Sequence, residues 1–253
     1  FLKGPTKATK YLWDQVTELN KKEKANGGVL DMDKRVSFID AYGPGYISDE
    51  KHRKDEKIVG VQTDAPFKRA YMPIGGIRMA DQAAISHGFT PDPKIQEIYT
   101  KYRKTHNQAV FEVYTPEMRA ARHAHIITGL PDAYGRGRII GDYRRIALYG
   151  VDFLIKEKQK FLNQKDVTMT EKVIRQREEI AEQIKALKAM IRMAKEYGDD
   201  ISQPAKNARE AIQWLYYGYL AAVKDQNGAA MSVGRNTTFL DIYIQRDLDL
   251  GII

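Results

Sequence analysis

Apolar residues recur at helical spacing in several parts of the chain. The clearest series lies at 171–197, where one face carries Ile174, Ile180, Ile184, Leu187, Ile191 and Ala194. Thr170 can cap the start of this segment, because a threonine hydroxyl accepts a backbone N–H of the first turn. Gly198 can end it, because glycine readily adopts the left-handed conformation that follows a helix. We therefore predict a long amphipathic helix over 171–197.

The same spacing predicts further helices. The stretch at 207–226 is mostly apolar, which indicates a helix that is buried on more than one side. The remaining helical segments are shorter or less regular, and we place them at about 8–22, 93–106, 117–124 and 139–160.

Strand signals are fewer. The short apolar pieces between 58 and 79 are separated by prolines and glycines, which predicts strands or loops. Alternation at 107–116 predicts a strand that ends at Pro116. Residues 1–57 are polar and interrupted by glycine and proline, so we expect them to cover the main body, 58–253. Together these patterns predict a helix-rich α/β fold.

Composition and charge narrow the class of protein. The chain has 253 residues, 43% hydrophobic and 29% charged, which is ordinary for a globular domain. No apolar run approaches the ~20 residues that cross a bilayer, so we expect no membrane partner. The net charge is +8, but acids are interleaved with the basic residues, and we expect no nucleic-acid partner. The absence of cysteine excludes disulfides and a thiol nucleophile within this chain.

A glycine- and arginine-rich stretch, "PDAYGRGRIIGDYRRIALYG" at 131–150, is the main candidate for a binding site. Its glycine spacing is one residue too long for a dinucleotide fingerprint, and no strand leads into it. Arg136 and Arg138 are predicted to lie in a loop before a helix, where guanidinium groups favour anions such as a carboxylate. The alternative is that they pair with Asp132 or Asp142 and only fix the loop.

Histidines give a weaker signal. The five histidines include one close pair, His123 and His125. These two would not share a face of a helix, although they would share a face of a strand, and no nearby carboxylate completes a set of metal ligands. We therefore predict no metal site.

Several longer stretches resemble one enzyme family. They are "EKIVGVQTDAPFKRAYMPIGGIRM", "NQAVFEVYTPEMRAARHAHIITGLPDAYGRGRIIGDYRRIALYG" and "EAIQWLYYGYLAAVKDQNGAAMSVGRNTTFLDIYIQRDL". They closely resemble the pyruvate formate-lyase (formate acetyltransferase) family of glycyl radical enzymes, across nearly the whole chain. The "NGAAMSVGR" element around Arg235 is similar to one shared more widely among glycyl radical enzymes.

The resemblance implies a fold and two site residues. The fold would be a ten-stranded α/β barrel, made of two five-stranded halves and wrapped by helices, of which residues 1–253 supply the N-terminal portion. Arg138 matches the arginine that holds the carboxylate of pyruvate in this family, whereas Arg136 receives no role. Phe111 is similar to an aromatic residue that accompanies the adenine of coenzyme A.

The resemblance also implies a reaction and partners. The family cleaves pyruvate by radical chemistry, coenzyme A takes the acetyl group as co-substrate, and formate leaves. In this family the stored glycyl radical and the paired cysteines lie in sequence that follows the part matched here, so we expect this chain to be a fragment that is inactive alone. We expect it to use no metal. The implied partners are a radical-SAM activating enzyme, the remainder of the same chain and a second copy in a homodimer. The implied setting is anaerobic glucose metabolism in the cytoplasm.

Two alternatives remain open from the sequence. One is another glycyl radical enzyme, either a diol dehydratase or a formate-lyase that acts on 2-ketobutyrate. The other is a basic, non-catalytic module that binds phosphates or RNA, whose binding would weaken with salt.

Overall fold

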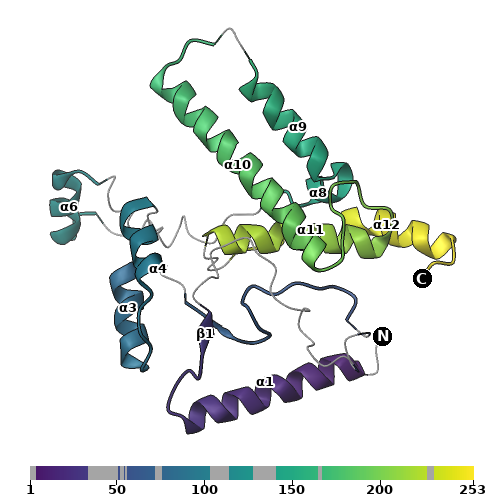
Figure 1. Ribbon diagram of the computed structural model, residues 1–253, viewed down its shortest axis with the longest axis horizontal. Helices are drawn as coiled ribbons and strands as arrows, with labels where there is room; N and C mark the ends of the chain where they lie inside the picture. The colour runs from purple at the N-terminus through teal and green to yellow at the C-terminus, as the bar shows by residue number, and fades with distance from the viewer. Residues whose placement is uncertain are drawn as a thin grey trace.

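The computed structural model describes residues 4–33, 51, 54, 56–71, 76–102, 114–127, 141–164, 167–226 and 231–253. This part of the chain is rich in helix (Figure 1). Its helices are α1 (Lys7–Ala25), α3 (Ile77–Ser86), α4 (Pro93–Glu97), the π-helix η1 (Ile98–Tyr102), α6 (Pro116–His123), α8 (Arg144–Tyr149), α9 (Val151–Leu162), α10 (Glu171–Glu196), α11 (Ala208–Gln226) and α12 (Thr237–Asp249). Among the described residues, none of these helices has the length and apolar character needed to cross a membrane.

Strand structure is limited in the described residues. Strand β1 (Met32–Asp33) pairs in parallel with β2 (Arg69–Ala70). The prediction of strands or loops over 58–79 was wrong at its end, because α3 begins at Ile77. Most of the predicted strand at 107–116 lies outside the described residues. The described residues also do not test the ten-stranded barrel, which stays a prediction.

The long helix predicted at 171–197 is confirmed as α10. The Thr170 hydroxyl accepts the backbone N–H of Val173 at 3.3 Å, and Gly198 follows the helix with a φ of +88°. Helices α9 and α10 form a hairpin that projects from the rest of the molecule, with α11 and α12 at its base (Figure 1). The apolar face of α10 packs against the core from Ile180 to Ala194, whereas Ile174 near the start of the helix is exposed and the charged face remains in solvent.

The single helix predicted at 139–160 is broken at Gly150, between α8 and α9. Gly150 has φ +73° and ψ 159°, a conformation that residues other than glycine rarely adopt. A Cβ atom there would lie 2.5 Å from the carbonyl oxygen of Ser202. Ile201, which directly precedes Ser202, also contacts this break: its carbonyl accepts a hydrogen bond from the Val151 N–H at 2.9 Å. The break therefore depends on a neighbour that lies far away in the sequence.

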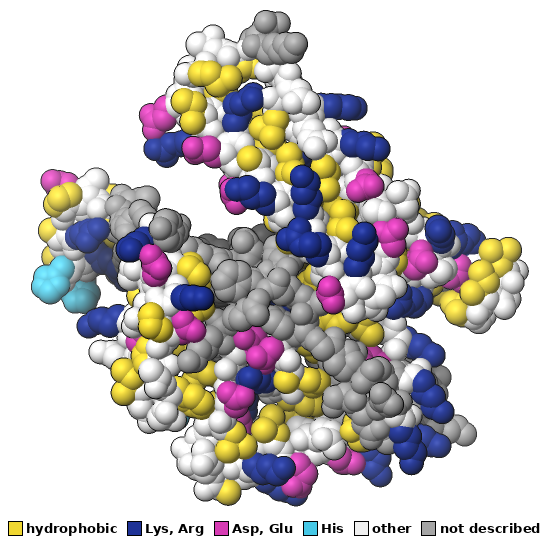
Figure 2. Space-filling model, viewed as in Figure 1, with side chains coloured by type: hydrophobic (Ala, Val, Ile, Leu, Met, Phe, Trp, Pro, Cys, Tyr) yellow, Lys and Arg dark blue, Asp and Glu magenta, His cyan; other side chains and the backbone are white. Residues whose placement is uncertain are grey.

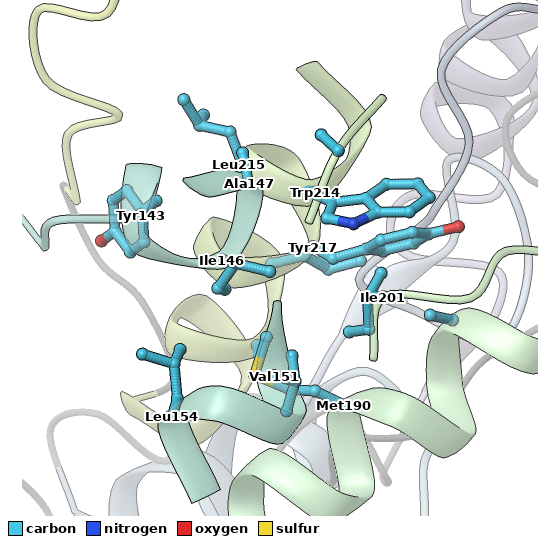
Figure 3. Close-up of a cluster of buried hydrophobic side chains, with 14 of the residues drawn as sticks. Tyr143, Ile146, Ala147, Val151, Leu154, Met190, Ile201, Trp214, Leu215 and Tyr217 are labelled. Atoms are coloured by element: carbon cyan, nitrogen blue, oxygen red, sulfur yellow. The ribbon is translucent and has the colours of Figure 1, made fainter. Parts of the chain in front are cut away.

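The main core forms where α8, α9, α10 and α11 meet (Figure 3). The side chains of Tyr217, Met193 and Ile201 are fully buried there, and burial of one large apolar side chain contributes about 1.5–3 kcal/mol. Gly218 lets α8 approach α11 closely, since a Cβ there would lie 2.5 Å from Cδ1 of Ile146. The prediction that 207–226 forms a largely buried helix is confirmed.

The segment at 57–61 lies along α11 and has no strand partner among the described residues. The Gln213 amide replaces that partner: its Oε1 accepts the Val59 N–H at 2.7 Å, and its Nε2 donates to the Val59 carbonyl at 2.8 Å. The Tyr216 hydroxyl donates to the carbonyl of Gly60 at 3.1 Å. Side chains of a helix thus satisfy backbone groups that a sheet would otherwise pair. The proposed boundary between residues 57 and 58 stays a prediction.

Candidate functional site

The predicted site residues Arg136, Arg138 and Phe111 lie outside the described residues. The structure does describe the chain that directly follows the arginine loop, from Gly141 onward. It also describes the second half of the "NGAAMSVGR" element, including Arg235.

The two segments meet at a pocket, which we call the Arg144–Arg235 pocket. Its volume is about 260 Å³. One wall comes from the start of α8 and the other from the turn before α12, and together they present Gly141, Asp142, Arg144, Val233, Gly234, Arg235 and Asn236. Two stretches that carry the family resemblance, far apart in the sequence, therefore line one cavity.

The charges in this pocket are unevenly matched. Arg144 donates two hydrogen bonds to Asp142, from Nε to Oδ1 at 2.6 Å and from Nη2 to Oδ2 at 3.1 Å. The hydrogen-bonded guanidinium of Arg144 holds the pKa of Asp142 below its usual range. Arg235 is exposed and makes no ion pair with another residue in the described ranges. Among the described residues that line the pocket, the one carboxylate is engaged by Arg144, and Arg235 adds a further positive charge.

Tyr143 lies beside this pocket with its side chain in the core (Figure 3). Its hydroxyl is buried and finds no hydrogen-bond partner among the described residues, and burial raises the pKa of Tyr143. The ring packs edge-on against Tyr219, with 5.7 Å between centroids. It also fills the space beside Gly141, where a Cβ would lie 2.6 Å from the ring. Tyr143 lies within the helix predicted at 139–160, but nothing in the sequence signalled that its hydroxyl would be buried.

A second pocket, which we call the α6 pocket, has a volume of about 510 Å³. The described residues that line it are Tyr114, Arg119, Arg122, His123 and His125. The histidine pair comes together because His123 ends α6 and His125 follows it with a φ of +60°. The pair was expected on either a continuous helix or a continuous strand, but His123 ends a helix and His125 has a left-handed backbone, so neither expectation describes it. Within the described residues, no group of three or more His, Asp or Glu side chains could hold a metal ion.

Solved structures of dehydratases share the fold of this chain. Hydroxyproline dehydratase from Clostridioides difficile superposes with a TM-score of 0.62 at 16% identity, over 99% of this chain and 38% of the dehydratase. The B12-independent glycerol dehydratase from Clostridium butyricum gives a TM-score of 0.61 at 16% identity, over 96% of this chain and 37% of its own. At this level of identity the likeness concerns the fold, which is helix-rich and belongs to the class that these enzymes share.

The sequence comparison goes further than the fold. The model of the family described as "Pyruvate formate lyase-like" matches residues 3–253, so the chain belongs to that family. It is 56% identical to a formate acetyltransferase of Haemophilus influenzae over 259 aligned positions, which cover all of this chain. The chain spans 33% of the length of that relative.

Proposed function

We propose that this chain is part of a formate C-acetyltransferase, which cleaves pyruvate with coenzyme A to give acetyl-CoA and formate. The observation that carries the proposal is the 56% identity to a formate acetyltransferase along the entire chain. The family match over residues 3–253 supports it independently of any single relative. The chain has no cysteine, so it lacks the thiols that react in this family and is inactive alone. Its part in the whole enzyme is to supply residues that bind the substrates.

Arg138 is the residue to which we assign the carboxylate of pyruvate. A guanidinium group presents a planar pair of N–H donors that matches a carboxylate, and such charge-assisted bonds are about twice as strong as neutral ones. Gly141, which follows Arg138 by three positions in the sequence, lines the Arg144–Arg235 pocket, whose described lining carries two arginines and one acid. A positive potential on this side favours an anionic substrate. We assign Phe111 to the adenine of coenzyme A, whose flat π-face suits an aromatic ring.

The experiment is a kinetic comparison of variants in the full-length enzyme. Arg138→Ala should raise the KM for pyruvate strongly, since a charge-assisted bond contributes about 1.5–3 kcal/mol. Arg138→Lys should restore little, because an ammonium group lacks the planar pair of donors. Arg192→Ala, which removes an exposed arginine from α10, is the matched control and should leave KM unchanged. Unchanged pyruvate kinetics in Arg138→Ala would refute the assignment.

The remaining parts of the proposal concern the whole protein. They are a ten-stranded barrel completed by later sequence, a glycyl radical formed by a radical-SAM activating enzyme, a homodimer and a cytoplasmic location. The radical and the paired cysteines would supply C–C bond cleavage, whereas this chain binds and orients the anionic substrate. Competition between pyruvate and 2-ketobutyrate would decide which 2-keto acid is preferred.

A further inference from the structure

The N-terminus of α12 lies at the Arg144–Arg235 pocket. The four residues that directly precede this helix, Val233 to Asn236, line the pocket on that side. The first N–H groups of a helix point out of its N-terminal end, where the helix dipole favours negative charge. The first turn of α12 contains no acidic residue. The helix therefore presents positive charge to the pocket, and no acid of its first turn offsets that charge.

The cap of α12 leaves these N–H groups without an acceptor. Asn236 occupies the N-cap position, where an asparagine side chain commonly accepts an N–H of the first turn. Here Nδ2 of Asn236 donates instead to the Val233 carbonyl at 2.6 Å, and no side-chain capping bond forms. Among the described residues, the N–H groups of Thr237, Thr238 and Phe239 have no hydrogen-bond acceptor. Helix ends satisfy such groups with side chains, water or ligands, so this end can bind an anion.

Arg235 adds a full positive charge beside the end of the helix. It is exposed and directly precedes the N-cap residue Asn236. Within the described ranges, no ion pair or hydrogen bond engages its guanidinium group. Arg144, by contrast, donates two hydrogen bonds to Asp142, so that pair adds little net charge. Of the two arginines in the described lining, Arg235 is the one whose donors remain available to a ligand.

Two tyrosines hold the described walls of the pocket in place. The Tyr143 ring packs edge-on against Tyr219, with 5.7 Å between centroids, and the Tyr219 hydroxyl donates to the carbonyl of Met231 at 3.2 Å. Tyr143 is only 7% exposed, and its hydroxyl points away from the other labelled side chains of the core (Figure 3). That hydroxyl lies 3.0 Å from the position of a Cβ atom on Gly141 and has no acceptor among the described residues. A ligand would thus meet a pocket that core packing has already formed.

The size and charge of the pocket indicate the class of ligand. A volume of about 260 Å³ lies just below the range of drug-sized sites and suits an anion of few non-hydrogen atoms. A guanidinium group and backbone N–H groups match the two coplanar oxygens of a carboxylate. A phosphate group carries more charge and suits sites with several cations. Nucleic acid would need a concentrated track of positive charge, whereas Lys and Arg side chains are spread over the visible face (Figure 2).

We propose that the Arg144–Arg235 pocket binds a small carboxylate, with Arg235 and the first N–H groups of α12 as its donors. The carboxylate class follows from the pocket alone. The identity of the ligand as pyruvate or formate, the two carboxylates of the proposed reaction, rests on the proposed function. Arg235 is then a carboxylate-binding residue in addition to Arg138.

The test is a ligand-detected NMR titration of the full-length protein without activation, so that no substrate is consumed. The probes are labelled formate, acetate and pyruvate, with inorganic phosphate as a separate probe, all at one ionic strength. Arg235→Gln should weaken the binding of the carboxylates about tenfold, as expected for loss of a charge-assisted contact. Arg235→Lys should restore only part of this affinity, because an ammonium group lacks the planar pair of donors.

Two further variants isolate the pocket. Arg192→Gln removes an exposed arginine of α10 outside the pocket, so it is the matched control and should leave binding unchanged. Arg138→Ala removes the arginine to which the proposed function assigns pyruvate, so the binding that remains in this variant reports on Arg235. Arg235 is exposed, so its variants should fold, which circular dichroism can verify.

The outcomes separate this inference from the proposed function. If the carboxylates bind equally well to the parent protein and to Arg235→Gln, the inference is wrong, while pyruvate binding that depends on Arg138 would leave the proposed function in place. If carboxylate binding depends on Arg235 but the activated enzyme forms no formate from pyruvate, the pocket is upheld and the proposed function fails. If phosphate binds and the carboxylates do not, or if Arg192→Gln weakens binding as much as Arg235→Gln, the inference is overturned.

Discussion

Substitution of Gly150 by alanine provides the sharpest test of the packing described above. The added Cβ would lie 2.5 Å from the carbonyl oxygen of Ser202, and 2.6 Å and 2.8 Å from the carbonyl carbon and Cα of Gln203. These contacts are with backbone, so no side-chain rotation can relieve them. The backbone of Gly150 also has φ +73° and ψ 159°, which is nearly restricted to glycine.

The expected magnitude combines two effects. Backbone strain of this kind costs about 1–3 kcal/mol. Overpacking of a well-packed region costs about a further 1–3 kcal/mol. Since about 1 kcal/mol shifts Tm by roughly 2–4 °C in a protein of this size, Gly150→Ala should lower Tm by roughly 5 °C or more. The change should also loosen the hydrogen bond of 2.9 Å from Val151 N–H to the Ile201 carbonyl.

Gly198→Ala is the matched control for this prediction. Gly198 also has a positive φ, +88°, but a Cβ there would have no atom within 4 Å. Gly198→Ala should therefore lose only the free energy that an alanine in the left-handed conformation costs, about 1–2 kcal/mol. Both variants and the parent chain would be melted by circular dichroism at the same scan rate and pH. If Gly150→Ala melts together with Gly198→Ala, the contact with the 201–205 segment does not determine the break between α8 and α9.

Three further predictions follow from particular contacts. Gln213→Leu should destabilise the chain by about 1–2 kcal/mol in urea unfolding, because both backbone groups of Val59 lose their partner. Gln159→Leu, at an exposed position of α9, should change the stability little, and equal effects of the two substitutions would contradict the reasoning. The Ala208 N–H donates a hydrogen bond to the buried Asp247 carboxylate and lowers its pKa. The stabilisation by Asp247 is therefore present above about pH 4 and is lost as the pH falls further. Asp247→Asn should therefore be less stable at neutral pH and show a flatter loss of stability on acidification, and an unchanged acid profile would refute this. Finally, the 253-residue chain mixed with pyruvate, coenzyme A and the activating enzyme should give no formate, since it has no cysteine, and measurable turnover would overturn that expectation.

Local signals predicted some elements well. The helix α10 could be predicted with its N-cap Thr170 and its end at Gly198, because capping and the period of 3.6 residues depend on neighbours in the sequence. The apolar helix α11 could be predicted for the same reason. The helix α3 was missed, because the proline and glycine just before it suggested a loop that continues to Met79.

The residues that line the pockets were harder to predict from the sequence than the helices. The sequence indicated anion chemistry in the arginine loop, but it gave no sign that Arg235 lines a cavity with Arg144. It placed His123 and His125 close together without the turn that brings both to one pocket. In each case the missing information is the position of a segment that is distant in the sequence, or a backbone angle outside regular structure.

The sequence by itself determined the family, the main helices and the absence of a thiol within this chain. Those properties depend on residue identity and on spacing over a few turns. Only the tertiary structure decided where α8 ends, since the break at Gly150 accommodates the backbone of Ser202 and Gln203. Only the tertiary structure showed that Gln213 takes the place of a strand partner for Val59. The physical reason is the same in both cases: steric contact and hydrogen bonding act over a few ångströms in space, whatever the separation along the chain.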